Sequence, residues 1–428
     1  MATHEIFGDA AAACCHGLRE LVGAPVLRVA PGTAAANWMH DGEPVVLVGP
    51  DKPLRGAAGA RHRHGSRGAV YAPLGAPGAP PRALPADGPA RHGGARLMVN
   101  EPIWLMVVKC VVLATIVITF FAYMSLFERK ILGRAPLRPG PNRVGPMGLL
   151  QPLADVLKLV AKEDFVPQGA NRVLFQMAPA MSLATAVAGL SLIPFGNPTT
   201  IFGQPINLVG LDVPIGLLLA FALSGIGFYG LILGGWASGN KYSLLGAART
   251  AAQLVSYEVS MGLSVVGVVL LARSMSLMDI VHAQQHTVWY VLLQPVAFLI
   301  FMVAAVAETN RTPFDLPESE SELVAGFMTE YGGMKFATYM MSEYLNMIVV
   351  SAIGATLFLG GFDGPFLPGW IWITIKVCAL LFLFIWLRAT LPRLRYDQLM
   401  RLGWKVLLPL ATANLVITAI IVGVFFAK

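Results

Sequence analysis

The sequence predicts an all-α fold: a polytopic membrane helix bundle with about eight transmembrane helices plus a cytoplasmic-side amphipathic helix. Composition, the length of the apolar blocks and the placement of basic residues lead to this prediction. Of the 428 residues, 56% are hydrophobic and 13% are charged, and the mean hydropathy is +0.64. These values exclude an ordinary soluble domain. The net charge of +7 does not indicate nucleic-acid binding, because no basic patch contains interleaved aromatic residues.

The first 97 residues differ in kind from the rest. They are rich in Ala, Gly and Pro and show no sustained apolar period, which is typical of a disordered segment. Cys14 and Cys15 have no spaced second pair, so no metal site is expected. We therefore predict a low-complexity, disordered extension at residues 1–97 and an integral membrane unit at residues 98–428. Because Met98 directly precedes the first apolar block, we also hypothesise that the native chain starts there; a peptide from residues 1–97 in mass spectra of the native protein would refute this.

After Met98, about eight apolar blocks are long enough to cross about 30 Å of hydrocarbon as helices. Their approximate spans are residues 102–124, 174–195, 212–235, 252–272, 289–307, 337–360, 370–388 and 405–426. Pro295 lies inside the fifth block, where neighbouring helices can satisfy the backbone groups that it frees.

Basic residues orient this bundle. After Met98, nearly all Arg and Lys residues outside the spans fall in alternate joins. The positive-inside rule makes those joins cytoplasmic. Both ends of the membrane unit are then predicted to face outward.

The first cytoplasmic join contains a helical apolar stripe. Its members recur at the spacing of one helix face: Leu149, Leu153, Val156, Leu157 and Val160. Asp155 and Lys158 fall elsewhere on the same helix, so we expect it to lie on the membrane surface. The simpler alternative is a surface helix that only caps the bundle.

The same join also holds candidate partners for acidic groups. Arg138 and Arg143 flank a Pro-Gly-Pro turn, a rigid way to present guanidinium groups to acids or to a partner subunit. Glu128 and Arg129 lie where the first predicted helix reaches the membrane interface. We expect them to pair with neighbours across a cavity.

An acidic segment joins the fifth and sixth predicted spans. It sets a single base, Arg311, against five carboxylates: Glu308, Asp315, Glu318, Glu320 and Glu322. Ionised groups are costly to desolvate, so beside a membrane they lie in water, pair with partners or mark an ion or proton path. Crowded carboxylates also raise one another's pKa, so some can hold protons near neutral pH. A solvated face that docks peripheral subunits is a compatible alternative.

Two further carboxylates lie within predicted spans. Glu258 is well inside the fourth span, and Glu343 is near the start of the sixth. An ionisable residue inside a membrane indicates a functional site; the alternative is a carboxyl held neutral by a structural hydrogen bond. Lys109 and Lys376 are weaker candidates because a long side chain can reach the interface.

Four ordered strings carry a family resemblance. They are residues 127–132 with 140–155, residues 235–242, the acidic segment with residues 329–331, and residues 395–400. Residues 100–426 closely resemble the quinone-chamber membrane subunit of proton-pumping NADH:quinone oxidoreductase, or complex I, called the H subunit in bacteria and subunit 1 in mitochondria. Residues 1–97 have no counterpart in that family.

The resemblance implies a quinone tunnel that opens to the bilayer and leads to an iron-sulfur cluster in peripheral subunits. Quinone is then the substrate, this chain alone binds no cofactor, and iron-sulfur clusters and FMN belong to partner subunits. The remaining Cys110 and Cys378 are too few to hold a cluster. The expected partners are the peripheral-arm quinone-site and iron-sulfur subunits, antiporter-like and small membrane subunits, and membrane lipid, in a bacterial inner membrane.

The resemblance and the residue chemistry together give two candidate sets. The quinone-binding set is Glu128, Arg129, Arg138, Asp155, Lys158, Arg311 and Phe314. The proton-coupling set is Glu308, Asp315, Glu318, Glu320, Glu322, Glu258 and Glu343. We expect quinone reduction to change the local charge and shift the acidic segment, and the carboxylates to pass this change toward the antiporter-like subunits.

Two other classes stay open at this point. A membrane anchor of a related hydrogenase-type complex would be distinguished by its neighbouring genes. A secondary ion transporter would be expected to show inverted repeats and helices broken at the membrane midplane. The sequence does not distinguish ubiquinone from menaquinone.

Overall fold

The computed structural model describes residues 103–197, 199–201, 204–206, 208–285, 287–317 and 320–425. The predictions for residues 1–97 lie outside these ranges. The described chain is helical apart from a short hairpin, in which β1 (Thr199–Ile201) pairs antiparallel with β2 (Gln204–Ile206). Six helices in the described residues are long and apolar enough to cross a membrane. The predicted polytopic helix bundle is therefore confirmed.

Each predicted span overlaps a long or apolar helix. These helices are α3 (Ile103–Arg134), α5 (Arg172–Leu190), α6 (Gly216–Ala237), α7 (Lys241–Ala272), α10 (Pro295–Glu308), α12 (Gly333–Phe358), α13 (Gly369–Thr390) and α15 (Leu408–Phe425). The shorter helices are η1 (Pro146–Gly148), α4 (Gln151–Val160), α8 (Leu277–Gln285), α9 (Tyr290–Leu293), α11 (Glu320–Leu323), η2 (Gly326–Met328), α14 (Tyr396–Arg401) and η3 (Leu402–Leu407).

The structure differs from the sequence prediction mainly at helix ends. α7 begins at Lys241 rather than at residue 252, because the Asn240 side chain caps it by accepting a hydrogen bond from the backbone N–H of Tyr242 at 3.0 Å. The fifth predicted span is divided at Gln294 into α9 and α10. Pro295 explains this division, since it has no N–H to continue a helix.

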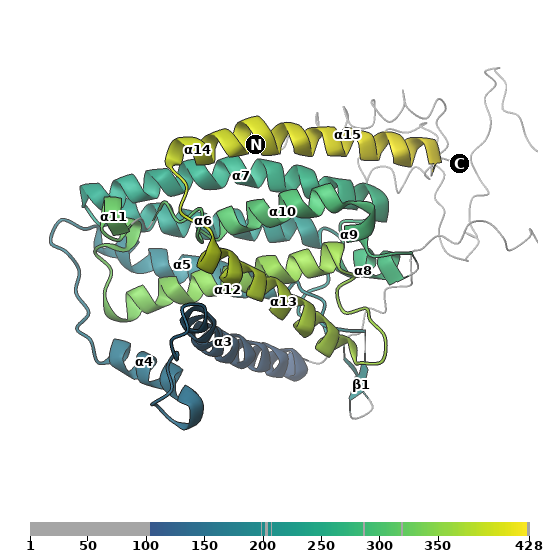
Figure 1. Cartoon of the computed structure of the whole chain (residues 1–428). Helices are drawn as coiled ribbons and strands as arrows, with labels where there is room; N and C mark the ends of the chain where they lie inside the picture. Colours follow the sequence, from purple (N-terminus) through teal and green to yellow (C-terminus); the bar gives the residue numbers. More distant parts are fainter. Residues whose placement is uncertain are drawn as a thin grey trace, which may run out of the picture. The chain divides into compact units, whose positions relative to one another are not determined.

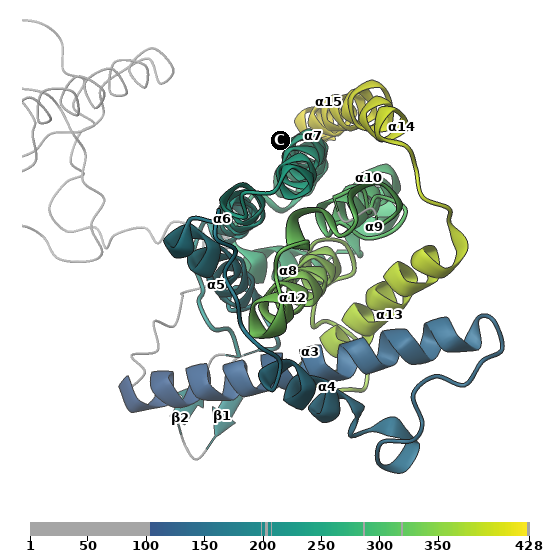
Figure 2. The same ribbon diagram turned by 90° about the vertical axis from the view of Figure 1, so that its left-hand side faces the viewer.

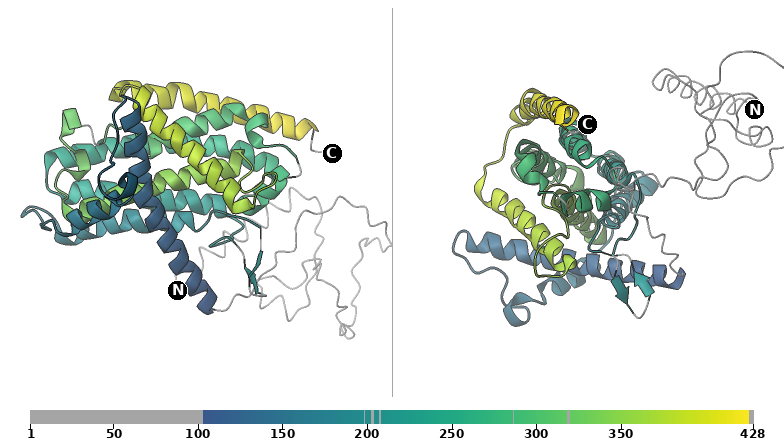
Figure 3. Two further views of the ribbon diagram at one scale, coloured as in Figure 1. Left: turned by 60° about the horizontal axis from the view of Figure 1, so that its bottom comes forward. Right: turned by 90° about the vertical axis from the view of Figure 1, so that its right-hand side faces the viewer.

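The long helices pack around α10 and α12. α12 contacts α3, α5, α10 and α13, while α7 contacts α6, α10 and α15. In the ribbon views, α5, α6 and α7 lie on one side of α12 and α13 lies on the other (Figures 1 and 2). α3 runs obliquely to the other long helices (Figure 3). This arrangement brings the ends of α3, α10, α12 and α13 to a common region.

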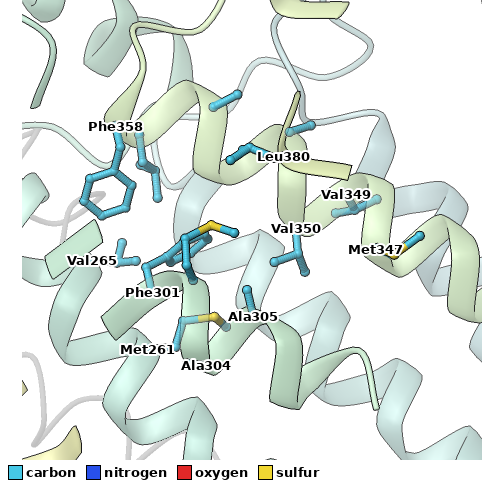
Figure 4. Packing of buried hydrophobic residues seen from close by; sticks show 14 of the residues in the cluster. Met261, Val265, Phe301, Ala304, Ala305, Met347, Val349, Val350, Phe358 and Leu380 are labelled. Atoms are coloured by element: carbon cyan, nitrogen blue, oxygen red, sulfur yellow. The ribbon is translucent and has the colours of Figure 1, made fainter. Parts of the chain in front are cut away.

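A continuous hydrophobic core fixes α10 against α7, α12 and α13. Met261, Phe301, Val350 and Leu380 meet there, one from each of these helices (Figure 4). Gly354 allows the close approach of α12, because an added Cβ would lie 2.8 Å from the Phe301 ring. Since well-packed interiors resist displacement, the core holds both ends of the acidic segment in place.

The predicted amphipathic helix is present as α4. Its predicted apolar stripe is exposed in this chain, with exposed fractions from 43% at Val156 to 61% at Leu157. α4 packs against α3 and α12 through its other side. An exposed apolar stripe on a helix beside membrane spans is the pattern of a helix at the membrane surface.

Candidate functional site

Arg311 lies at the centre of a buried charge cluster. It follows α10 and is 8% exposed. Its Nη1 donates to Oε1 of Glu128 on α3 at 3.0 Å, and its Nη2 lies 4.0 Å from Oε2 of Glu343 on α12. The Tyr344 ring faces the guanidinium at 4.3 Å from its centroid, a cation–π contact. The base of the acidic segment therefore links the first and sixth predicted spans.

Glu128 receives two guanidinium groups. Its side chain is almost fully buried, and Arg388 at the end of α13 donates to the same oxygen as Arg311. Burial acts to lower the pKa of Arg311, but the carboxylates of Glu343 and Glu128 outweigh this effect and hold that pKa above its ordinary value. A buried charge is tolerated only with such partners, so α3, α12 and α13 depend on one another at this end of the bundle.

Asp315 anchors the acidic segment to the chain that follows α13. Nη2 of Arg393 donates to its Oδ2 at 2.8 Å, and the backbone N–H of Leu394 donates to the backbone oxygen of Pro313 at 3.1 Å. Burial raises the pKa of Asp315 above its ordinary value, while the nearby Arg393 opposes that rise. The proton affinity of Asp315 therefore depends on whether the acidic segment keeps this carboxyl group in contact with Arg393.

Gln253 fixes the start of the acidic segment on α7. This fully buried side chain donates to the backbone oxygens of Ala307 at 2.8 Å and Phe314 at 2.9 Å, and to Oδ1 of Asn310 at 3.2 Å. Buried polar groups are normally satisfied in this way. The turn between α10 and Phe314 is thus held by one side chain.

Glu308, the last residue of α10, lines a cavity of about 60 Å³. Ser224 on α6 donates to its Oε1, and the cavity also contains the polar side chains of Ser182, Thr185, Ser342 and Asn346. Glu258 on α7 is close enough for its charge to act on Glu308. Most of the lining is apolar, but these polar groups and the volume of the cavity give room for a water beside Glu308.

A larger cleft of about 720 Å³ lies between the end of α4 and the start of α12. Its lining combines two bases with apolar and aromatic groups: Lys158, Leu159, Ala161, Lys162, Tyr331, Gly332, Gly333 and Phe336. Of the predicted quinone-binding set, Lys158 lines this cleft.

Besides Glu308, Glu258, Lys158 and Phe314, whose places are given above, the other predicted residues that the structure describes fall into three groups. Glu128, Arg311 and Glu343 meet in the buried cluster, with Asp315 beside them through its own arginine. Arg129 and Asp155 form a more exposed pair at 2.7 Å, and Arg138 is exposed. Glu322 pairs with Arg249 at 2.5 Å on the surface.

Two predicted acids cannot be placed. Glu318 lies outside the described residues, and for Glu320 only the helical backbone of α11 is described.

Sequence reasoning missed five residues of the site: Ser224, Gln253, Tyr344, Arg388 and Arg393. Arg388 and Arg393 served only to orient the helices. Arg388 ends a predicted span and Arg393 follows it closely, which was a usable signal, since cations there can reach acids at the same membrane face. Ser224 and Gln253 were polar residues in apolar blocks, which is a weaker signal of the same kind.

Two of the ordered strings, residues 235–242 and residues 329–331, contact each other in the structure. Nδ2 of Asn240, in residues 235–242, donates to Oε1 of Glu330, in residues 329–331, at 2.6 Å. The Tyr331 hydroxyl donates to the backbone oxygen of Gly234 at 3.3 Å. These contacts fasten the far end of the acidic segment to α6 and α7.

The fold and the cluster define a multi-pass membrane protein with paired charges gathered at one end of its helix bundle. A family model described as NADH dehydrogenase matches residues 108–419. The chain belongs to this family.

Three relatives illustrate the similarity, each over most of both chains. The H subunit of NADH-quinone oxidoreductase from Thermomicrobium roseum is 54% identical over 319 residues, covering 72% of this chain and 94% of the relative. The H subunit numbered 2 of the same enzyme from Geobacter sulfurreducens is 55% identical over 310 residues, covering 72% and 94%. The H subunit from Deinococcus radiodurans is 49% identical over 340 residues, covering 75% and 85%.

Proposed function

We propose that this chain is the membrane subunit of a proton-pumping NADH:quinone oxidoreductase that lines the quinone tunnel and couples quinone reduction to proton translocation. The observation that carries the proposal is the position of Arg311. It joins carboxylates from α3 and α12 while belonging to the acidic segment itself. A change of charge at this point acts on three separate parts of the bundle. The names of the relatives, all H subunits of NADH-quinone oxidoreductases, support the same assignment.

The cleft between α4 and α12 supports a quinone path. A long-tailed quinone needs an apolar route with polar groups near its head. Leu159 and Phe336 supply apolar surface in the cleft, and Lys158 and Lys162 supply charge at its edge. In this proposal quinone is the substrate, this chain binds no cofactor alone, and the electrons come from FMN and iron-sulfur clusters in partner subunits.

The carboxylates give a route from quinone chemistry to proton movement. Reduction of quinone draws protons and changes the charge near Arg311. The two carboxylate partners of Arg311, Glu128 and Glu343, lie on α3 and α12. Asp315 then changes its contact with Arg393, and the acidic segment moves between arrangements. Glu308 lines a cavity that can hold water, and Glu258 is close enough for its charge to act on Glu308. They pass the change toward the antiporter-like subunits.

The same proposal specifies the membrane, the orientation and the neighbouring subunits of this chain. It lies in a bacterial inner membrane, with both ends of residues 98–428 facing outward. The joins that carry most bases face the cytoplasm, where the peripheral-arm quinone-site and iron-sulfur subunits bind. The antiporter-like and small membrane subunits adjoin it within the bilayer. The placement of bases supports this orientation.

The test replaces Glu308 by Gln and Asp315 by Asn, one at a time, in the assembled enzyme. We expect proton pumping per electron to fall by about tenfold in at least one of them, because a proton-transferring group is removed. Asp164→Asn is the matched control: it makes the same change of charge at an exposed carboxylate outside both candidate sets, which pairs with Lys335 at 2.8 Å, and pumping should persist. Unchanged quinone reduction and unchanged pumping in both E308Q and D315N would refute the proposal.

A further inference from the structure

The last membrane helix begins with a π-helical turn. α14 leads into η3, Leu402–Leu407, where the backbone N–H of Leu408 donates to the oxygen of Gly403 before α15 begins. π-helical turns are rare and are frequently found at functional sites. Such a turn holds an additional residue compared with an α-helical turn. Its formation or loss therefore changes the register of the helix that follows.

Tyr257 on α7 holds this turn in place. It is fully buried, and its hydroxyl donates to the backbone oxygen of Leu399 at 2.9 Å. Its ring lies against Gly403, where an added Cβ would be 3.5 Å from the nearest ring carbon. The neighbouring Ser256 hydroxyl accepts a hydrogen bond from Nε1 of Trp404 at 3.0 Å. Two consecutive residues of α7 thus bind the start of the last helix.

The same tyrosine contacts the acidic segment. The rings of Tyr257 and Phe314 have centroids 5.5 Å apart and planes at 51°. Gln253, one turn earlier on α7, donates to the backbone oxygen of Phe314. Both rings are buried. Since buried side chains are closely packed, Phe314 cannot move without changing the surroundings of the Tyr257 ring.

α15 has a second attachment farther along its length. Nε2 of Gln294 donates to Oγ1 of Thr418 at 2.7 Å, and Nδ2 of Asn414 donates to Oε1 of Gln294 at 3.0 Å. α14 and α15 lie along α7 (Figure 1), and their segment is the least buried of the six candidate spans in the described residues. Because α15 is attached near its middle and is little buried elsewhere, its first turn can move while the rest of the helix stays in place.

We propose that Tyr257 is a positioning residue that couples the location of Phe314 to the helical register at residues 402–407. A displacement of the acidic segment then changes the π-helical turn and moves the beginning of α15. Because α15 lies on the surface of the bundle, a neighbouring membrane subunit can contact it and respond to this displacement. This inference goes beyond the proposed function, because it holds whether or not the acidic segment carries protons.

The test measures hydrogen–deuterium exchange of the backbone amides of residues 402–408 in the assembled, detergent-extracted complex. Phe314→Ala, Tyr257→Phe and the double variant are compared with the unaltered chain. We expect exchange to be about fivefold faster in Y257F, the factor that corresponds to loss of one hydrogen bond of ordinary strength, and also faster in F314A, which removes the ring contact with Tyr257. In the double variant, F314A should add little to the effect of Y257F.

The chain offers a matched control pair. Phe327 and Tyr339 are also buried, with ring centroids 5.4 Å apart, and the Tyr339 hydroxyl donates to the backbone oxygen of Gly230 on α6. Phe327→Ala and Tyr339→Phe should leave exchange at residues 402–408 unchanged.

Two outcomes overturn the proposal. One is unaltered exchange in F314A. The other is an equal increase from F314A with or without the Tyr257 hydroxyl, because that means the segment acts independently of this tyrosine. If Y257F prevents assembly, F314A is compared with Phe327→Ala alone, and exchange at residues 402–408 that is no faster in F314A than in F327A overturns the proposal.

Discussion

Replacing Arg311 by Met tests whether the buried charge cluster holds the bundle together. The variant keeps much of the side-chain volume but removes the guanidinium from Glu128 and Glu343. We expect the subunit to be released from the detergent-extracted complex at a lower temperature. The measurement is the fraction of the subunit retained in the complex on native gels after brief heating.

The size of the effect follows from the contact distances. At an effective dielectric constant of about 20, the 3.0 Å contact with Glu128 is worth about 5 kcal/mol before desolvation is subtracted. Breaking a buried pair costs about 3–5 kcal/mol, because the remaining charge is left uncompensated. Arg388 still contacts the same oxygen, so the lower value applies. At about 2 °C per kcal/mol, the release midpoint should fall by roughly 6 °C.

Arg129→Met provides the matched control. This arginine also pairs with a carboxylate, Asp155, at 2.7 Å, but the two side chains are 52% and 25% exposed. Exposed pairs contribute below about 1 kcal/mol, so the midpoint should change by no more than about 2 °C. In R311M/E128Q the buried carboxylate that lost its Arg311 partner is replaced by a neutral amide, so part of the stability should return. Equal shifts for R311M and R129M, or no recovery in the double variant, contradict the reasoning.

Two further predictions concern packing and pH. Gly234→Ala places a Cβ 2.0 Å from the Tyr339 hydroxyl and should lower the stability of the bundle by about 1–3 kcal/mol. In Gly262→Ala the added Cβ has nothing within 4 Å, so this control should be neutral or stabilising. The release midpoints of the two variants test this difference. Because burial raises the pKa of Asp315, its contribution to stability is full below the ordinary Asp value of about 3.9 and is lost as pH rises through the raised folded value. Asp315→Asn should remove this loss of stability. The measurement is the release midpoint of both chains at a series of pH values that starts below about 3.9 and rises through the raised pKa of Asp315.

Much of the fold could be predicted from composition and periodicity. The predicted spans, the surface helix α4 and the position of the acidic segment all follow from local sequence, because a bilayer demands long apolar helices and sorts bases to one side. Helix ends were less accurate. The early start of α7 depends on the Asn240 cap, and the break at Gln294 depends on Pro295, both of which are local signals that hydropathy alone ignores.

The candidate site was only partly predictable. Glu128, Arg311 and Glu343 were each singled out as charges close to or inside the membrane, but nothing in their spacing showed that they meet. Arg388 was treated as a marker of orientation, although it donates to the same Glu128 oxygen as Arg311. Arg129 and Arg138 were predicted in the same quinone-binding set as Glu128 and Arg311, yet both are exposed.

The sequence by itself determined that this protein is a membrane helix bundle and that five carboxylates are gathered in the acidic segment between the fifth and sixth spans. Those conclusions depend on transfer free energies of single segments, which each segment carries within itself. Only the tertiary structure decided which charges pair, and it made Arg311 the link between α3 and α12 and Tyr257 the link between the acidic segment and α15. Electrostatic and packing contacts act over a few ångströms, so they exist only once helix packing has set the distances.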